Sequence, residues 1–203
     1  MPGFYEEKIF SRLCDVLMKQ FEDVRPRLIE QARGRVLEIG LGSGHNLPFY
    51  REAVTELVAV EPSPGMTDLA KKRIAHCAFP VRVVQGSAEK IPEPAGSFDT
   101  VVSTFTFCTI ADPLAAAQEA RRVLKPGGRF LFLEHVVNPG PKVALWQRRL
   151  NPLWKRAFCG CELHRDTWGI LEKAGFNLSA AKRINVEAPA IVRHLIVGTA
   201  TAS

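Results

Sequence analysis

The stretch Val36–Asn46, with the sequence VLEIGLGSGHN, decides the fold. A short apolar run that is typical of a buried strand leads into glycines at alternate positions, Gly40, Gly42 and Gly44. Glycine allows the backbone to turn sharply and to approach a ligand that a Cβ atom would keep away. The stretch therefore predicts a strand, a ligand-binding loop and a helix, in that order.

Two carboxylates and a histidine narrow the choice of ligand. The dinucleotide-binding fingerprint needs its third glycine at position 45, where this chain has His45. Glu38, two residues before Gly40, favours a cationic ligand over a pyrophosphate. Glu61 ends the next predicted strand, about 20 residues after the loop, where a carboxylate accepts both hydroxyls of a ribose. A NAD-dependent oxidoreductase is therefore disfavoured.

Outward from the loop, short apolar runs alternate with helical patterns. Strands are expected near residues 36–39, 57–61, 81–84, 98–103 and 129–134. This alternation indicates an α/β fold with a parallel sheet built from βαβ crossovers. Two more strands, near residues 176–184 and 192–199, are joined by a short loop and predict an antiparallel pair at the sheet edge.

The N-terminal segment predicts one long amphipathic helix over residues 5–31. Its apolar stripe places Ile9, Leu13, Leu17 and Phe21 four residues apart. We expect this helix to lie across the domain rather than to begin its sheet.

Composition favours a single globular domain over residues 1–203, because 46% of the residues are hydrophobic and 24% are charged. The five cysteines are odd in number and irregular in spacing, so we expect free thiols in a reducing compartment.

The first ten residues lack the apolar stretch of a secretory signal, and no run of 18 apolar residues occurs. We expect a cytoplasmic protein, with peripheral attachment to a membrane as an open alternative.

Most of the excess positive charge falls in one segment. Residues 142–166 hold six basic and two acidic residues, a net +4 of the +6 of the whole chain. Asn151-Pro152 is expected to divide two short basic and aromatic helices, which suggests a lid over an acceptor site or a surface for anionic lipid. A further helix is expected over residues 165–174, ended by Gly175. Nucleic-acid binding is not expected, because the basic stretch is short and no aromatic-basic RNA motif occurs.

Five motifs in order resemble the class I S-adenosylmethionine-dependent methyltransferases. They are EIGLGSG at Glu38–Gly44, VAVEPS at Val58–Ser63, GSAEKIP at Gly86–Pro92, SFDTVV at Ser97–Val102 and LKPGGRF at Leu124–Phe130. The resemblance covers roughly residues 34–135 and implies S-adenosylmethionine as the cofactor. It also implies a Rossmann-like, three-layer α/β/α fold with seven mostly parallel strands, the last one inserted antiparallel.

That resemblance implies a cofactor site over the strand ends. Glu38 is expected near the methionine end of the cofactor, Gly40 and Gly42 beneath it, and Glu61 on the ribose. The turn at Gly86-Ser87-Ala88 is expected to border the adenine, although relatives commonly have aspartate at position 87, so Glu89 is a second candidate for that edge. The remaining residues of the expected cofactor set are Gly44, Asn46, Pro62, Ser63, Met66 and Thr104.

The last third narrows the resemblance. LEHVV at Leu133–Val137 and GCELHRDTW at Gly160–Trp168 are similar to the methyltransferase-like 7 group, the membrane-associated alkyl-thiol S-methyltransferases. This similarity implies S-methylation of a small, lipophilic thiol. Those relatives carry an N-terminal hydrophobic anchor that this chain does not show, so we do not expect their membrane residence to transfer.

Three other functions stay open at this point. They are N-methylation of a phospholipid headgroup, C-methylation of a quinone precursor, and a non-catalytic module that binds the cofactor and docks on a membrane or protein.

Within the single domain we expect an N-terminal helical segment (1–33), a cofactor-binding core (34–135), a lid and acceptor segment (136–175) and a C-terminal β-hairpin (176–203).

Methyl transfer from a sulfonium needs an acceptor with a free lone pair and requires no covalent enzyme nucleophile. A thiol with a pKa of about 8.5 is mostly protonated at neutral pH, so a base would help. His135 and His164 are the candidate bases, because histidine titrates nearest to pH 7. An orienting role for His135 and a surface position for His164 are the alternatives.

Other candidates follow the fourth predicted strand and the lid. Thr104 and Cys108, with Phe105 and Phe107, lie where this fold places acceptor-facing groups or core residues. Cys161 is a candidate for acceptor contact, or else a small buried hydrophobe. We expect no metal site, because Cys159 and Cys161 are too close in sequence for the usual zinc pair and no second pair follows.

Overall fold

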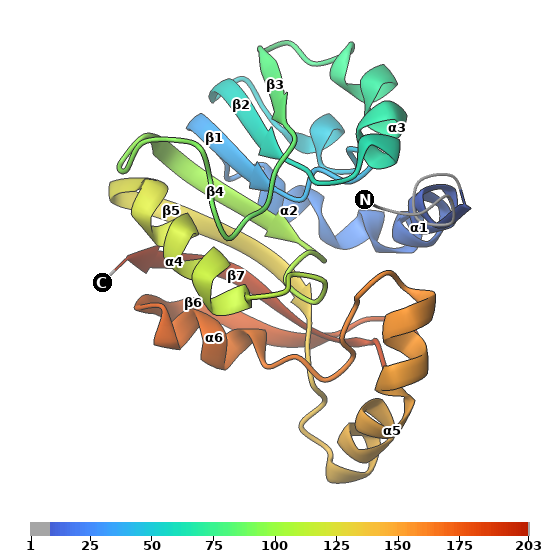
Figure 1. Cartoon of the computed structure of the whole chain (residues 1–203). Helices are drawn as coiled ribbons and strands as arrows, with labels where there is room; N and C mark the ends of the chain where they lie inside the picture. Colours follow the sequence, from blue (N-terminus) through green and yellow to red (C-terminus); the bar gives the residue numbers. More distant parts are fainter. Residues whose placement is uncertain (1–8, 203) are drawn as a thin grey trace.

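The computed structural model describes residues 9–202 of the chain, and the predicted helix start at residue 5 lies outside them. Seven strands form one sheet in the order β3-β2-β1-β4-β5-β7-β6 (Figure 1). The strands are β1 (Gly34–Ile39), β2 (Val54–Val60), β3 (Val81–Val84), β4 (Phe98–Thr104), β5 (Leu124–His135), β6 (Phe176–Asn185) and β7 (His194–Ala202).

Strand directions agree with the predicted fold class. β1 pairs in parallel with β2 and β4, as β2 does with β3 and β4 with β5. β7 runs antiparallel to both of its neighbours, β5 and β6, so it is the one reversed strand of the sheet. The expectation of a mostly parallel sheet with an inserted antiparallel strand is confirmed.

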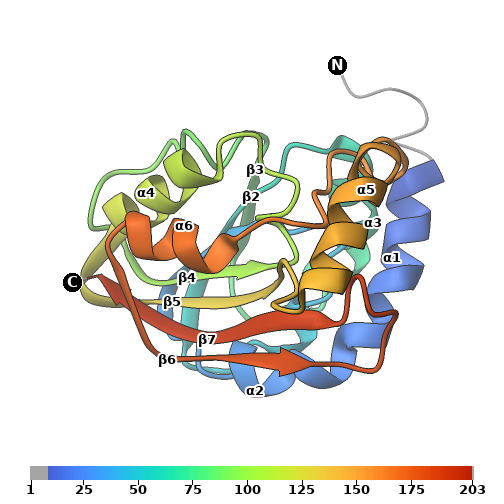
Figure 2. The same cartoon turned by 90° about the horizontal axis from the view of Figure 1, so that it is seen from below.

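Helices cover both faces of the sheet and give the three layers. They are α1 (Ser11–Met18), η2 (Lys19–Val24), α2 (Pro26–Ile29), η3 (Leu47–Phe49), α3 (Pro64–Ile74), α4 (Pro113–Val123), α5 (Pro141–Ala157) and α6 (Thr167–Lys173). α4 and α6 pack on one face, and α2 and α3 on the other (Figures 1 and 2). α1 and α5 lie beyond the carboxyl ends of the parallel strands (Figure 2).

The central strand shows why an apolar run forms here. Val36, Leu37 and Ile39 in β1 are completely buried. Leu37 and Ile39 pack in the core under α4 and α6, whereas Val36 packs on the opposite face. A parallel strand that is covered on both faces needs apolar side chains in both directions.

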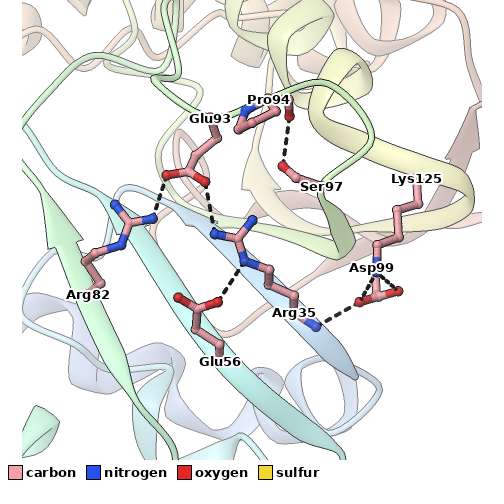
Figure 3. Close-up of polar contacts among 8 residues, drawn as sticks. All are labelled: Arg35, Glu56, Arg82, Glu93, Pro94, Ser97, Asp99 and Lys125. Carbon is pink, nitrogen blue, oxygen red and sulfur yellow. Dashed lines mark hydrogen bonds and ion pairs between the residues drawn. The ribbon is translucent and has the colours of Figure 1, made fainter.

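Charged side chains tie together the opposite, amino-terminal ends of the strands (Figure 3). Arg35 of β1 pairs with Glu56 of β2 at 2.7 Å and with Glu93 at 3.0 Å, and its guanidinium lies 4.5 Å from the centre of the Phe98 ring. Arg82 of β3 also pairs with Glu93. This network therefore aligns three strands at the end of the sheet that is far from the glycine loop.

The expectation of one long N-terminal helix is wrong. The described part is divided into α1, η2 and α2, and Pro26 begins α2 because its missing N–H suits the first turn of a new helix. The apolar stripe is also divided. Ile9 and Leu13 are 50% and 43% exposed, whereas Leu17 and Phe21 face an internal cavity.

The expectation of two short helices around Asn151-Pro152 is also wrong, because α5 runs through Pro152 without a break. Asn151 does not cap a helix; its Oδ1 accepts the N–H of Leu163 at 2.9 Å. Pro152 is exposed, so water can satisfy the carbonyl that loses its helical partner. α6 begins two residues later than expected, at Thr167, where Asp166 caps it by accepting the N–H of Gly169.

Within residues 9–202, none of the helices has the length and apolar character needed to cross a lipid bilayer.

Candidate functional site

A cavity of about 740 Å³ lies at the carboxyl ends of the parallel strands, between the glycine loop, α1 and the end of α5. It brings together residues from loops that are far apart in sequence. The predicted site residues that line it are Gly40, Gly42, Asn46, Glu61, Pro62, Ser63, Met66, Ser87, Ala88, Glu89, Thr104, His135 and Cys161. Glu38 and Gly44 are not among the lining residues.

The glycine loop has the open backbone that its sequence suggested. Gly42 has a φ of +56°, and no atom lies within 4 Å of the position that a Cβ would take. That open space faces the cavity, so a ligand can approach the backbone directly. Gly40 has a φ of +72°, and there a Cβ would clash with the side chain of Thr106.

Polar contacts hold this loop against two helices. Asp15 of α1 lies 3.1 Å from His45 Nε2 and 3.2 Å from a guanidinium nitrogen of Arg73 of α3. Arg73 also donates to the carbonyl of Ser43 at 2.7 Å. His45 therefore anchors the loop to α1 where a dinucleotide-binding fold has a glycine.

Glu61 is a buried carboxylate at the end of β2. Its Oε2 accepts the N–H of Gly42 at 2.8 Å, and its Oε1 accepts the N–H of Ser63 at 2.9 Å. Each carboxylate oxygen can accept a second hydrogen bond. Glu61 can therefore accept one hydroxyl on each oxygen while keeping its two backbone contacts, an arrangement that suits two neighbouring hydroxyls.

Glu38 is completely enclosed and supports the loop from behind. Its Oε1 accepts from Asn46 Nδ2 at 2.8 Å and its Oε2 accepts from Tyr50 at 2.9 Å. Burial raises the pKa of Glu38 to about 7, against the lowering effect of the bonds from Tyr50 and Asn46. Asn46 lines the cavity, whereas Glu38 lies behind it and holds the Asn46 side chain in place.

Arg25 is a functional candidate that the sequence analysis missed. Its guanidinium donates to Asn46 Oδ1 at 2.6 Å and to Thr104 Oγ1 at 2.8 Å, and lies 5.3 Å from the centre of the Phe105 ring. Among the described residues that line the cavity, it is the only lysine or arginine. An arginine in the middle of an apolar N-terminal stripe was the available signal.

The far end of the cavity carries the turn after β3. Ser87 Oγ donates to Glu89 Oε2, and Glu89 Oε1 accepts the N–H of Asp112 at 3.2 Å. Ala88 between them is buried and lines the wall. Ser63 closes the near side by capping α3, since its Oγ accepts the N–H of Met66 at 3.2 Å.

The other half of the cavity is aromatic and apolar. Trp154 of α5 stacks on Phe158 with ring centres 3.9 Å apart, and Phe10 meets the edge of Phe158 at 6.3 Å. On the opposite wall, Phe21 packs against Phe105 with ring centres 4.6 Å apart. These walls come from the N-terminal segment, the loop after β4 and the end of α5, so they suit an apolar ligand shielded from water.

Cys108, His135 and Cys161 gather at the apolar half. Their sulfur and ring-nitrogen atoms all lie within 4.8 Å of one another, with His135 Nε2 3.2 Å from Cys161 Sγ. Trp154 Nε1 donates to the same sulfur at 3.3 Å. His135 Nδ1 is buried and has no hydrogen-bond partner among the described residues.

This grouping shifts the titration of all three side chains. The hydrogen bond with Cys108 lowers the pKa of Cys161 most, burial opposes it, and the bonds from His135 and Trp154 bring it to about 4. Burial lowers the pKa of His135, but the hydrogen bond and charge of Cys161 more than offset this, so the net direction is upward. The bond to Cys161, and then burial, hold the pKa of Cys108 well above its ordinary value.

Glu134 shapes the loop that carries Cys108. Its buried carboxylate accepts from Ser103 Oγ at 2.7 Å and from the N–H groups of Thr106 and Phe107 at 3.1 Å. Phe105, within that loop, has a φ of +56°, which is strained for a side chain of this size. Glu134 therefore holds a strained turn that aims Phe105 and Cys108 at the cavity.

Two candidates lie elsewhere. His164, the second candidate base, is not among the residues that line the cavity, and Phe107 is completely buried in the core. The expectation of no metal site used only the spacing of Cys159 and Cys161. That spacing does not show that Cys108, from the loop after β4, and His135, from the end of β5, approach Cys161 and complete a donor set that zinc accepts.

Comparisons with known proteins agree with this geometry. A profile described as "Methyltransferase domain" matches residues 37–132. Thiol S-methyltransferase TMT1A of Homo sapiens is 36% identical over 190 residues, which cover 91% of this chain and 75% of that protein. Thiol S-methyltransferase TMT1B of Rattus norvegicus is 39% identical over 147 residues, 70% of this chain, and the match spans only 59% of the rat protein.

Solved structures support the fold alone. A SAM-dependent methyltransferase from Thermotoga maritima, described as a possible histamine N-methyltransferase, has a TM-score of 0.67 at 22% identity and covers 96% of this chain and 99% of that one. The YcgJ protein of Bacillus subtilis has a TM-score of 0.65 at 24% identity, covering 84% of this chain and 74% of that one.

Proposed function

The chain belongs to the thiol S-methyltransferase family of S-adenosylmethionine-dependent methyltransferases, and from this premise we propose that it methylates the sulfur of a small, apolar thiol. One observation carries the proposal. A single cavity joins a polar side lined by Gly42, Glu61 and Arg25, called the cradle here, to an aromatic side that contains His135 and Cys161. Donor and acceptor therefore have neighbouring places in one cavity.

The residues present fit S-adenosylmethionine at the first half of this cavity. Glu61 lines the cavity with its two carboxylate oxygens fixed by the N–H groups of Gly42 and Ser63, a position that suits the two ribose hydroxyls, and Gly42 leaves room for close approach to the backbone. Arg25 offers the positive charge that the carboxylate of the methionine portion needs, with Asn46 and Thr104 fixing its direction. When bound, this cofactor supplies an electrophilic methyl group on a sulfonium.

The chain itself contributes to methyl transfer by orienting the acceptor, by excluding water and by providing a group that accepts the acceptor's proton. The aromatic walls exclude water and hold an apolar acceptor against the cradle. Alignment of this kind contributes on the order of 7–11 kcal/mol to rate enhancements. His135 Nε2 is engaged with Cys161, so its buried Nδ1 is the atom left to accept the proton of the acceptor thiol. Cys161 then acts as the negative partner that orients the imidazole.

A panel of acceptors tests the proposed function. The purified protein is incubated with S-adenosylmethionine and an alkyl thiol, an aromatic thiol, an aminolipid or a quinol, and S-adenosylhomocysteine release is measured. We expect turnover with the thiols. Turnover with the amine or quinol alone would replace S-methylation by N- or C-methylation. Cofactor binding without any turnover would support a non-catalytic binding module.

Peripheral contact with an anionic membrane is a second part of the proposal. α5 exposes Trp146 and Leu153, which are 55% and 72% exposed, beside the exposed Arg148 and Arg149. Val16 of α1, at the same end of the molecule, is 61% exposed (Figure 2). Apolar side chains flanked by cations suit the interface of an anionic bilayer.

Vesicle sedimentation tests this contact. Vesicles that contain phosphatidylserine should retain the protein, and vesicles of phosphatidylcholine alone should not. Leu153→Ser together with Trp146→Ser should abolish retention. Equal sedimentation of this variant and the parent protein would contradict a role for α5.

A further inference from the structure

Methyl transfer does not require all the reactive groups in the cluster of Cys108, His135 and Cys161. Methylation of a thiol needs one base, yet the cavity wall also holds two cysteine sulfurs within 4.8 Å of each other. The two cysteines come from different segments, the loop after β4 and the loop after α5, which the Glu162 N–H joins by donating to the Cys108 carbonyl at 2.9 Å. The pair is therefore held by backbone contacts as well as by side chains.

The surroundings of Cys161 favour the thiolate. Its sulfur has donors on two sides, His135 Nε2 at 3.2 Å and Trp154 Nε1 at 3.3 Å. These contacts, with the bond to Cys108, agree with a pKa of about 4. A thiolate that lines a cavity beside a second thiol is the arrangement found in redox-active cysteine pairs.

A bound metal explains the geometry less well. Histidines that ligate a metal almost always donate their other ring nitrogen to an oxygen or to water. His135 Nδ1 has no such protein partner within the described part of the chain. The contact of 3.2 Å between His135 and Cys161 is a hydrogen bond as it stands.

We propose that Cys161 and Cys108 form a redox-active dithiol that reduces small, uncharged disulfides entering the aromatic half of the cavity. The Cys161 thiolate attacks one sulfur of the disulfide R–S–S–R, so that a mixed disulfide Cys161–S–S–R forms and RS⁻ leaves. The Cys108 thiol gives up its proton and attacks Cys161 Sγ, the second RS⁻ leaves, and a Cys108–Cys161 disulfide forms. The disulfide substrate is reduced by two electrons, the protein dithiol is oxidised by two, and an external dithiol restores the protein.

Formation of the mixed disulfide at Cys161 favours the later attack by Cys108. While Cys161 is a thiolate, its hydrogen bond and charge are leading causes that keep Cys108 protonated. Capture of Cys161 in a mixed disulfide removes both, whereas His135 remains beside the pair. Cys108 then loses its proton more readily and stands next to the sulfur that it must attack. The thiols released in this way appear in the same cavity as the cradle for the methyl donor.

The activity goes beyond methyl transfer and needs no cofactor, so its test is independent of the proposed function. The probe is 2,2′-dithiodipyridine, a small aromatic disulfide that is uncharged at pH 5 and releases a chromophore, mixed with the fully reduced protein at that pH. A thiol of pKa about 8.5 is about 0.03% ionised there, whereas Cys161 is mostly ionised. A lower intrinsic nucleophilicity, by about 100-fold, offsets part of this advantage. The fast phase should therefore exceed the rate of an ordinary cysteine about thirtyfold.

The expected stoichiometry is two chromophores in the fast phase, with a Cys108–Cys161 linkage in a non-reducing digest. Cys108→Ser should release one chromophore and retain one probe-derived group by mass, and Cys161→Ser should lose the fast phase. Cys159→Ser is the matched control and should behave as the parent protein. Charged glutathione disulfide should react more slowly than the aromatic probe.

Three results would overturn the inference. They are a fast phase that survives Cys161→Ser, a linkage that maps to another cysteine pair, and stoichiometric zinc in the purified protein that Cys108→Ser and Cys161→Ser both remove. Methyl transfer to thiols is measured separately, by the acceptor panel.

Discussion

Replacement of Glu61 by alanine should weaken cofactor binding without unfolding the protein. The carboxylate accepts two backbone N–H groups, from Gly42 and Ser63, and a carboxylate oxygen can accept more than one hydrogen bond, so a ribose hydroxyl can be added on each oxygen. A hydrogen bond to a charged group contributes about 1.5–3 kcal/mol. Loss of two such bonds, at the lower value because water refills the space, amounts to about 3 kcal/mol, or a dissociation constant about 100-fold higher.

Isothermal titration with S-adenosylhomocysteine measures this change directly. Glu61→Gln keeps one carbonyl oxygen and should weaken binding by about tenfold, between the alanine variant and the parent. Glu52→Ala is the matched control, because Glu52 is exposed on the loop before β2 and does not line the cavity. Urea unfolding of each variant confirms that the protein is folded. A folded Glu61→Ala variant whose dissociation constant stays within threefold of the parent value would refute the assignment of Glu61 to the ribose.

Three further perturbations separate the parts of the site. Gly42→Ala should lower the free energy of unfolding by only about 1–2 kcal/mol, because the positive φ is strained but no atom crowds the added methyl group. The same substitution should lower the affinity for S-adenosylhomocysteine at least tenfold. Calorimetry that shows an unchanged affinity would contradict this. His135→Gln should lower kcat about 100-fold and leave the cofactor affinity unchanged. In the parent protein the rate should fall as the pH drops through the raised pKa of His135, and the variant should not show this fall. If the rate of the variant still falls at low pH, His135 is not the base. Burial raises the pKa of Glu134 from 4.5 to about 7, so the folded state holds its proton more tightly than the unfolded state. Its contribution to stability is therefore complete below about pH 4.5 and is lost as the pH rises through 7, by about 3 kcal/mol. Urea unfolding at pH 5 and pH 8 should show a loss of stability that is about 3 kcal/mol smaller in Glu134→Gln than in the parent protein, because Glu38, whose pKa is also raised to about 7, contributes to the loss in both.

The sheet could be predicted from the sequence because its strands are apolar on both faces. Val36, Leu37 and Ile39 are buried apolar residues of one short strand, interrupted only by Glu38, and the glycines after the strand stand at alternate positions. Local signals of this kind identify each strand, and the handedness of βαβ crossovers then restricts their order. The antiparallel pairing of β6 and β7 followed in the same way from the short loop between them.

The N-terminal segment and α5 were less predictable, because their apolar residues do not all face the core. Ile9 and Leu13 point to solvent, and Leu17 points into a cavity rather than onto the sheet. Periodicity cannot distinguish these destinations. Pro152 suggested a helix boundary, although an exposed proline inside a helix is tolerated where water replaces the lost partner.

The polar part of the site depends on contacts that no local pattern encodes. Arg25 reaches Thr104 across 79 positions of sequence, and Cys161 meets His135 across 26. Cys108 joins them from a third segment, which is why the spacing of Cys159 and Cys161 was uninformative. Glu38 was placed correctly at the end of its strand, but only the structure shows that Asn46 stands between it and the cavity.

Transfer of a labelled methyl group tests the central claim most directly. The protein is incubated with S-adenosylmethionine that carries a trideuterated methyl group and with an apolar alkyl thiol, and the products are separated by mass spectrometry. The site described above predicts a trideuteromethyl thioether formed in equal amount with S-adenosylhomocysteine, and loss of both products in Glu61→Ala. Binding of the cofactor with no labelled thioether from any thiol would contradict it.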